Sequence, residues 1–319
     1  MVKLSTLRIL RFIKRTSGGY ILAFLLIIAA AFAALLSTAG PERKTRIGIL
    51  SYAGETISDN SLLELVGNWF DKDNSLEVFY RSTQTDASVQ AHQLESLVSE
   101  GCQVIIIDRN DFSRNEQPII NAAAAGVRLL AINADVTGGS RVYVGTNPYD
   151  EGYLMGDYLH HNLPHQASLI YITNPNSFFS QQQLQGFSES CLLFRPDVRL
   201  IIAEDISDTA AGAVQAVDAV LRKNPGLRTA ALAAPRLNTA QSVREAIIKS
   251  GRTVSVACCI SSDPAVSAAL TDGTVQAAVG IDQSSLAEDV YQLTSDLIRG
   301  EAVADKLYSP VLRTAENPR

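Results

Sequence analysis

No acidic residue occurs before Glu42 in this chain, and the stretch from Tyr20 to Ala39 contains no charge of either sign. About twenty apolar residues are enough for a helix to cross the roughly 30 Å hydrocarbon core of a bilayer. Five basic residues precede the stretch: Lys3, Arg8, Arg11, Lys14 and Arg15. Because basic flanks stay on the cytoplasmic side, we expect a cytoplasmic segment over 1–19, a transmembrane anchor over 20–39 and a body outside the cytoplasm.

A cleaved signal segment is the alternative, because Ser37, Thr38 and Ala39 are small residues of the kind that precede a signal-peptidase site. The apolar region of such a signal usually has about 7 to 15 residues, whereas Tyr20 to Leu36 already has seventeen. This length favours a retained anchor; cleavage after Ala39 would instead release a secreted or periplasmic body. No cysteine follows the apolar run, which excludes a lipoprotein anchor at that point.

The chain also lacks the short motifs of catalysis. It has no Gly-x-Ser-x-Gly elbow, no Walker glycine loop and no histidine beside a plausible nucleophile. His160, His161 and His165 lie near a predicted helix end, but no carboxylate or cysteine spacing completes a metal site around them. We therefore predict no enzymatic activity, no cofactor and no metal site.

Cysteine is scarce, with four residues in 319: Cys102, Cys191, Cys258 and Cys259. Their spacing matches neither a compact disulfide framework nor a zinc site. We interpret most of them as small buried apolar residues.

After Ala39 the chain has fewer basic than acidic residues. The whole chain has a net charge of −6 and segment 1–39 contributes +5, so the remainder carries −11. Such an acidic body is a poor binder of nucleic acid. The body, which spans 40–319, is long enough for one large domain or two medium ones.

Short β-branched runs alternate with longer amphipathic ones between Arg46 and Leu312. Ten strands are predicted, at 46–51, 76–80, 103–107, 128–132, 142–144, 168–172, 199–203, 229–233, 253–258 and 275–279. Asp208 is expected to cap one of the intervening helices, which ends at Asn224. Several runs are apolar throughout, as in parallel strands covered on both faces, so we predict an α/β fold with doubly wound parallel sheets.

In such sheets ligands bind beyond the carboxyl ends of the strands. The segments at these positions are rich in Asn, Asp, Gln, Ser and Thr. They are 52–60, 108–114, 133–139, 145–150, 174–183, 234–238, 260–263 and 281–285. These side chains favour a polyol or an amide-bearing ligand that is held by hydrogen bonds.

Six segments taken in order carry a family resemblance. They are Arg46–Leu50, Leu94–Ile107, Ala125–Val127, Val144–Gly152, Gln185–Phe187 and Leu270–Val279. Over 45–312 the chain resembles the type I periplasmic binding proteins, specifically the ribose/galactose-binding group related to the sensory domains of LacI-type regulators. The resemblance implies two similar lobes that close around a ligand by hinge motion.

The resemblance also implies three crossings between the lobes, which we expect near Gly145–Pro148, Gly280–Gln283 and Lys306–Val311. The first lobe would comprise 45–146 and 283–305, and the second 149–280 and 306–312. The domains are therefore discontinuous in sequence.

Ten residues are the candidates for ligand contact that the family's cleft positions imply: Tyr52, Asp111, Asn133, Asn147, Gln181, Gln183, Arg236, Ser261, Asp263 and Asp282. Asp111 and Asn147 match the family's pattern. The Asp-Arg pair usual after the fourth strand is Asn133-Ala134 here, and the usual Asn-Asp pair of the second lobe falls at Pro235-Arg236. These departures indicate an altered polar ligand rather than a standard aldopentose or hexose.

Several candidates have a structural alternative. Asp111 either accepts ligand hydroxyls or caps a helix, and Asn147, which precedes Pro148, either contacts ligand or caps the helix that begins there. Gln181 and Gln183 either face the cleft or lie in a solvated first turn. Arg236 either binds an anionic group or lies exposed.

Taken together, the sequence predicts a membrane-anchored, extracytoplasmic protein that binds a sugar or sugar-like molecule. Its partner would be an ABC permease or a membrane sensor kinase. A ligand-free interaction protein with the same fold is the alternative.

Overall fold

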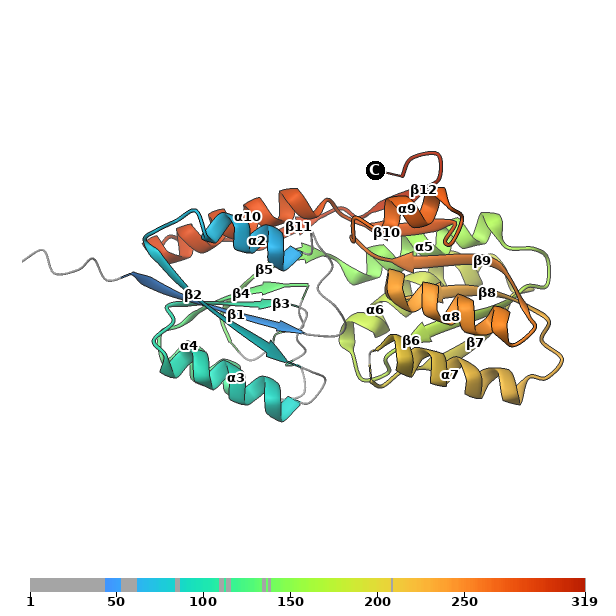
Figure 1. Cartoon of the computed structure of the whole chain (residues 1–319), viewed down its shortest axis with the longest axis horizontal. Coiled ribbons are helices and arrows are strands. Elements are labelled where there is room, and N and C mark those ends of the chain that lie inside the picture. The colour runs from blue at the N-terminus through green and yellow to red at the C-terminus, as the bar shows by residue number, and fades with distance from the viewer. Residues whose placement is uncertain are drawn as a thin grey trace, which may run out of the picture. The chain divides into compact units, whose positions relative to one another are not determined.

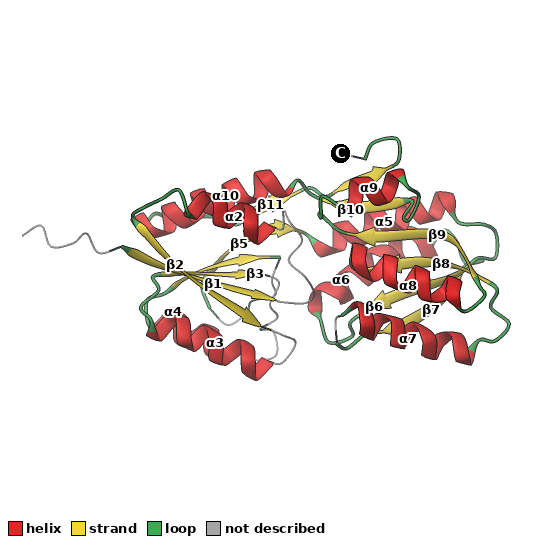
Figure 2. Cartoon of the chain, in the orientation of Figure 1, coloured by secondary structure: helices red, strands yellow, loops and turns green. Residues whose placement is uncertain are grey.

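The computed structural model describes residues 44–52, 62–83, 87–108, 112, 116–133, 136, 139–207 and 209–318. Residues Thr45–Arg319 form one compact unit, within which strands and helices alternate along the chain (Figure 1). The strands assemble into two separate six-stranded sheets, drawn in yellow in Figure 2. Two α/β lobes with parallel-sheet cores result, as the sequence predicts.

The first sheet has the strand order β11-β5-β4-β3-β1-β2, and all its pairings are parallel. Its strands are β1 (Thr45–Tyr52), β2 (Leu76–Thr83), β3 (Val104–Asp108), β4 (Arg128–Ile132), β5 (Arg141–Thr146) and β11 (Lys306–Tyr308). The second sheet has the order β12-β10-β9-β8-β6-β7, in which only β12 is antiparallel. Its strands are β6 (Ser168–Thr173), β7 (Arg199–Glu204), β8 (Thr229–Ala234), β9 (Thr253–Ile260), β10 (Ala277–Gly280) and β12 (Val311–Thr314).

Helices cover both faces of each sheet. They are α2 (Leu62–Phe70), α3 (Ala87–Ser99), α4 (Gln117–Ala124), α5 (Pro148–Asn162), α6 (Phe178–Phe187), α7 (Ala210–Lys223), α8 (Leu237–Lys249), α9 (Val266–Thr271) and α10 (Gln283–Arg299), with one π-helical turn, η1 (Ser188–Leu192). In the first lobe α2 and α10 pack on one face, and α3 and α4 on the other. In the second lobe α7, α8 and α9 lie opposite α5, α6 and η1.

Alternation along each strand explains this layering. In β3, Val104 and Ile106 enter one core cluster while Ile105 and Ile107 enter the other, and all four are fully buried. Neighbouring side chains of a strand point to opposite faces, so a strand that is apolar throughout needs a helical layer on each side.

The ten predicted strands are all present, as β1 to β10. Strands β11 and β12 were not predicted, because they are only three and four residues long and neither contains a buried residue. Lys306–Tyr308 pairs with β5 in the first sheet and Val311–Thr314 with β10 in the second. This pairing divides segment 306–312, which is expected from the sequence to belong to the second lobe, between the two sheets.

The predicted cap of α7 is wrong. Thr209 occupies the N-cap position, where its hydroxyl oxygen accepts a hydrogen bond of 3.0 Å from the Gly212 amide. Asp208, the predicted cap of this helix, lies outside the described residues.

All four cysteines are buried and free, which confirms their interpretation as core residues.

None of the helices that the structure describes is long and apolar enough to cross a membrane. The predicted cytoplasmic segment 1–19 and the predicted anchor 20–39 lie outside the described residues.

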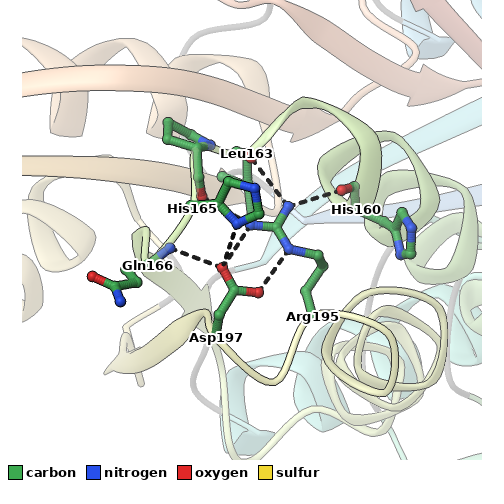
Figure 3. Close-up of polar contacts among 7 residues, drawn as sticks. His160, Leu163, His165, Gln166, Arg195 and Asp197 are labelled. Carbon is green, nitrogen blue, oxygen red and sulfur yellow. Dashed lines mark hydrogen bonds and ion pairs between the residues drawn. The ribbon is translucent and has the colours of Figure 1, made fainter.

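Arg195 joins the end of α5 to the segment that follows η1 (Figure 3). Its guanidinium donates hydrogen bonds of 3.0, 3.0 and 2.8 Å to the carbonyls of His160, Leu163 and Pro164, and it forms a bidentate pair with Asp197. The last carbonyls of a helix lack partners within the helix, and a cation there also complements the helix dipole. The Arg195 side chain thus caps α5 and fixes the turn into β6.

Helices α5 and α6 approach so closely that glycine is required where they meet. A Cβ added to Gly152 would lie 1.9 Å from the Gln183 carbonyl oxygen, and one added to Gly186 would lie 2.1 Å from the Tyr149 carbonyl oxygen. Because backbone atoms of the partner helix are the obstacles, a side-chain rotation cannot relieve either clash. The absence of a side chain at both positions is therefore what permits this helix pair.

We expect Gly152→Ala to lower the free energy of unfolding by about 2 kcal/mol, because overpacking at the contact exceeds the gain in helix propensity. Gly226→Ala is the matched control, since its Cβ would meet nothing within 4 Å, and we expect it to change stability by less than about 0.5 kcal/mol. Urea unfolding of the two variants measures the difference. Equal stability would show that α5 and α6 do not touch as described.

Candidate functional site

The carboxyl ends of the parallel strands bring several polar residues to one edge of the first sheet. Tyr52 ends β1 and Asp108 ends β3, and Ser51 of β1 is paired with Asp108 in the sheet register. The Asp108 side chain is fully buried, and its Oδ2 accepts a hydrogen bond of 3.3 Å from the Ser51 hydroxyl. A buried carboxyl at the end of an apolar strand is a functional candidate; Asp108 begins the segment 108–114 selected from the sequence, but it is not among the ten candidates for ligand contact.

Asn133 organises the first crossing between the lobes. It follows β4 with a positive φ of 43°, and its Oδ1 accepts a hydrogen bond of 3.2 Å from the Thr146 amide. A Cβ at Gly145 (φ +152°) would lie 2.1 Å from that oxygen, so the contact requires glycine. This candidate ligand residue therefore also holds the end of β5 in place.

Asn147 caps α5. Its Oδ1 accepts a hydrogen bond of 3.1 Å from the Tyr149 amide, and Pro148 occupies the first position of the helix. Of the two roles open from the sequence, the structure shows the capping one. The side-chain oxygen of Asn147 is therefore already engaged within the protein.

A buried carboxylate lies immediately after the first crossing. The Thr146 hydroxyl donates a hydrogen bond of 2.5 Å to Glu151 Oε1, and Gln183 Nε2 donates one of 2.9 Å to Glu151 Oε2. Burial raises the pKa of Glu151 above its ordinary value of 4.5, and the two hydrogen bonds partly oppose the rise. This network links the last residue of β5 to α5 and α6. Sequence analysis missed Glu151, because an acid in the first turn of a helix normally lies exposed and complements the helix dipole.

The two candidate glutamines of α6 both donate to groups of the protein. Gln183 binds Glu151 as above, and Gln181 Nε2 donates a hydrogen bond of 2.9 Å to the Pro175 carbonyl. Gln181 is exposed and Gln183 is half-buried.

Arg313 of β12 gathers three candidates at the edge of the second sheet. Its Nη2 donates a hydrogen bond of 2.5 Å to the Ser261 carbonyl, and its charge interacts with Asp282 and Asp263. Burial lowers the pKa of the Arg313 guanidinium, and the two carboxylates oppose that change. These residues follow β9 and β10 or belong to β12, so only the folded chain brings them together. Sequence analysis did not select Arg313.

Both carboxylates at this edge also cap backbone amides. Asp282 accepts hydrogen bonds of 3.4 and 2.9 Å from the Ser284 and Ser285 amides at the start of α10, and Asp263 accepts one of 2.7 Å from the Ala265 amide. The hydrogen bond from the Ser285 side chain is the main cause of the lowered pKa of Asp282.

Two buried polar atoms near this edge make no hydrogen bond within the described residues: Arg313 Nε and Gln283 Oε1. Gln283 is the first residue of α10, directly after Asp282. One atom is a donor and the other an acceptor, and buried polar groups in native proteins are normally paired. A ligand hydroxyl, which both donates and accepts, has the chemistry to satisfy either atom.

Three candidates remain: Arg236, Asp111 and Tyr52. Arg236 occupies the N-cap position of α8, where its side chain makes no capping hydrogen bond. Asp111 lies outside the described residues, and only the backbone of Tyr52 is described. Among the described residues no group of three His, Cys, Asp or Glu side chains is arranged to hold a metal ion. His165 lies beside Asp197 at 3.7 Å (Figure 3), and the ring of His160 contacts Phe194.

Residues 68–302 match the family model described as "Periplasmic binding protein domain", which is most of the chain. The chain belongs to the type I periplasmic binding protein family. This confirms the resemblance to the ribose/galactose-binding group that the sequence motifs indicate. No curated protein matches the chain in sequence.

Solved structures of other periplasmic binding proteins share the fold. An ABC transporter solute-binding protein from Mycobacterium smegmatis, solved with bound glycerol, is 19% identical with a TM-score of 0.74, and the match covers 86% of this chain and 96% of that one. The myo-inositol-binding protein of Caulobacter is 18% identical, with a TM-score of 0.72 and coverage of 88% and 95%. The fructose-binding periplasmic domain of a hybrid two-component system is 20% identical, with a TM-score of 0.72 and coverage of 86% and 92%. These relatives are named as binding proteins rather than enzymes.

The buried Glu151 predicts a pH dependence of stability. Because its pKa is raised in the folded state, the folded protein binds this proton more tightly than the unfolded chain. The stabilisation that protonated Glu151 contributes is fully present below its ordinary pKa of 4.5. It is lost as the pH rises through the raised pKa of the folded state. We therefore compare the unfolding free energy of the wild type with that of Glu151→Gln. The wild-type value minus the variant value should fall, as pH rises from 4.5 to the raised pKa, by up to about 1.4 kcal/mol per pH unit.

Urea unfolding at a series of pH values from 4 to 8 measures this difference. Glu189→Gln is the control, because hydrogen bonds from Tyr149 and Gln185 lower the pKa of Glu189 and give the opposite sign. A pH dependence that is the same in wild type and Glu151→Gln would contradict the assignment.

Proposed function

We propose that this periplasmic binding protein binds a sugar or sugar-like polar molecule at the strand edges that the crossings join. The observation that supports the proposal most directly is the group around Arg313. This group lies in or beside two of the crossings. It contains the carboxylates of Asp263 and Asp282, the Arg313 guanidinium with its unpartnered Nε, and the unpartnered Gln283 oxygen. Hydroxyl-rich ligands make bidentate hydrogen bonds to such side chains. No step of this function requires catalysis, a cofactor or a metal.

The location is part of the proposal. The uncharged run from Tyr20 to Ala39, with its basic flank, would hold the binding lobes outside the cytoplasm as a single-pass membrane protein. Cleavage after Ala39 would instead release them.

Two partners fit this arrangement. The relatives include a solute-binding protein of an ABC transporter and a domain of a two-component system. Ligand-driven closure of two lobes can be detected either by an ABC permease or by a membrane sensor kinase, because the ligand shifts the equilibrium between open and closed forms in both cases. The candidate anchor favours signalling slightly over uptake.

One observation favours a second candidate, a ligand-free interaction protein. Several candidate side chains are used within the protein: Asn147 and Asp282 cap helices, and Gln183 holds Glu151. A site that has lost ligand contacts could retain its fold for a protein partner.

The deciding measurement is thermal unfolding of the full chain, in non-ionic detergent, against monosaccharides, sugar acids, polyols, nucleosides and furanosides. A ligand present at a hundred times its Kd adds about 2.7 kcal/mol of stability. For a body of this size, we expect a saturable rise in midpoint of about 5–10 °C. No rise across the panel would favour the interaction protein.

Gln283→Met tests the site itself. Removing an unpartnered buried oxygen leaves the stability of the ligand-free protein unchanged or higher, whereas we expect ligand affinity to fall about tenfold. Gln241→Met, an exposed residue of α8, is the matched control and should retain full affinity. Asp111→Ala tests in the same assay whether that carboxylate contacts ligand. Unchanged affinity in Gln283→Met would place the ligand elsewhere.

A further inference from the structure

A polar groove lies at the edge of the second sheet where strands β6, β7 and β8 begin, opposite the edge that carries the Arg313 group. It has a volume of about 460 Å³ and is formed by Ser168, Arg199, Thr229 and the segment that joins α7 to β8. Three of the lining residues are cationic: Arg199, Lys223 and Arg228. No carboxylate is among the residues that line it.

This charge is unusual in a body whose net charge is −11. Several other surface cations form ion pairs, for example Arg46 with Glu77, Arg141 with Asp305 and Lys306 with Asp289. Within the part of the chain that the structure describes, Lys223 and Arg228 form no ion pair. Arg199 donates a hydrogen bond of 2.5 Å to Asn224 Oδ1, a neutral partner that leaves its charge uncompensated.

The dipole of α7 accounts for only part of this charge. Arg222 and Lys223 lie in the last turn of α7, where cations commonly complement the carbonyl end of a helix. Arg199 and Arg228 lie instead at the starts of β7 and β8. Asp197 is the acidic residue nearest to Arg199 in the sequence. Its carboxylate is bound by the Arg195 guanidinium and the Gln166 amide, so it does not compensate the charge of Arg199 (Figure 3).

The Asn224 side chain in the lining is already engaged at both its oxygen and its nitrogen. The Asn224 oxygen is occupied by Arg199, and its Nδ2 donates a hydrogen bond of 2.8 Å to the Val220 carbonyl. The three cations therefore dominate the groove. A phosphate group carries a charge of about −1.5 to −2 and several strong acceptor oxygens, which suits three cationic donors better than a single carboxylate does.

We propose that this groove is an anion site that takes a phosphate group, either free phosphate or the phosphate of an anionic lipid headgroup. The site is separate from the candidate ligand site, because the amino and carboxyl ends of parallel strands lie at opposite edges of a sheet. It does not depend on the proposed sugar binding.

The test is calorimetric titration of inorganic phosphate into the full chain, in non-ionic detergent at constant ionic strength. We expect saturable binding with a Kd of about 1 mM or tighter. In Lys223→Gln/Arg228→Gln, we expect Kd to rise at least about tenfold, because hydrogen bonds to charged groups are lost. Arg244→Gln/Lys249→Gln removes the same charge from the neighbouring helix α8 and should change Kd less than about twofold.

A second arm identifies the source of the phosphate. The titration is repeated with mixed micelles of phosphatidylglycerol and, as a reference, phosphatidylcholine. If free phosphate binds to the wild type and Lys223→Gln/Arg228→Gln weakens that binding, the ligand is a soluble anion. If only phosphatidylglycerol micelles bind, and the same variant weakens their binding, the ligand is a lipid headgroup. Either outcome supports the site.

The proposal fails if neither probe binds saturably, or if the α8 control variant weakens binding as much as the groove variant. It also fails if only an acidic peptide such as polyglutamate binds in a manner that depends on the groove, since the surface would then contact a protein. Each variant's unfolding midpoint is measured without phosphate, and Arg228→Gln alone replaces the double variant if that variant is less stable.

Discussion

Burial of both faces of two parallel sheets is the constraint on which the rest of this structure depends. Residues such as Ile105 and Ile106 point to opposite sides of β3 and are both fully buried, so helices must cover the sheet above and below. The connections are thereby confined to the two edges of each sheet. Polar residues of the loops collect there, and the candidate ligand site and the basic groove lie at opposite edges of the second sheet.

Two charged groups that are withdrawn from water, Glu151 and Arg313, lie beside places where the chain passes between its sheets. Glu151 follows the first passage and is held by Thr146 and Gln183, whereas Arg313 lies beyond the last and contacts Ser261. Removing such groups from water is costly unless hydrogen bonds replace the lost hydration. Glu151 has these partners, whereas Arg313 Nε has none within the described residues.

Sequence reasoning succeeded with local, repetitive patterns and was less successful with single side chains. The runs from β1 to β10 were predicted because short, mainly apolar runs recur there between longer amphipathic ones, while β11 and β12, at three and four residues, are too short to show a pattern. Asn147 was recognised as a capping or binding residue without a decision between the two. Glu151 was overlooked, because its burial depends on the close approach of α6 across Gly152, which is not visible in the neighbouring sequence.

The sequence by itself determined the α/β class, the family and the acidic character of the body, because apolar periodicity, motif order and charge are properties of neighbouring residues. Only the tertiary structure decided which polar groups meet. Ser261, Asp282 and Arg313 are separated by as many as 52 residues, and Arg199 begins β7 whereas Arg228 directly precedes β8. Contacts of this kind arise from strand order and helix packing, which depend on the burial of the whole chain rather than on any local segment.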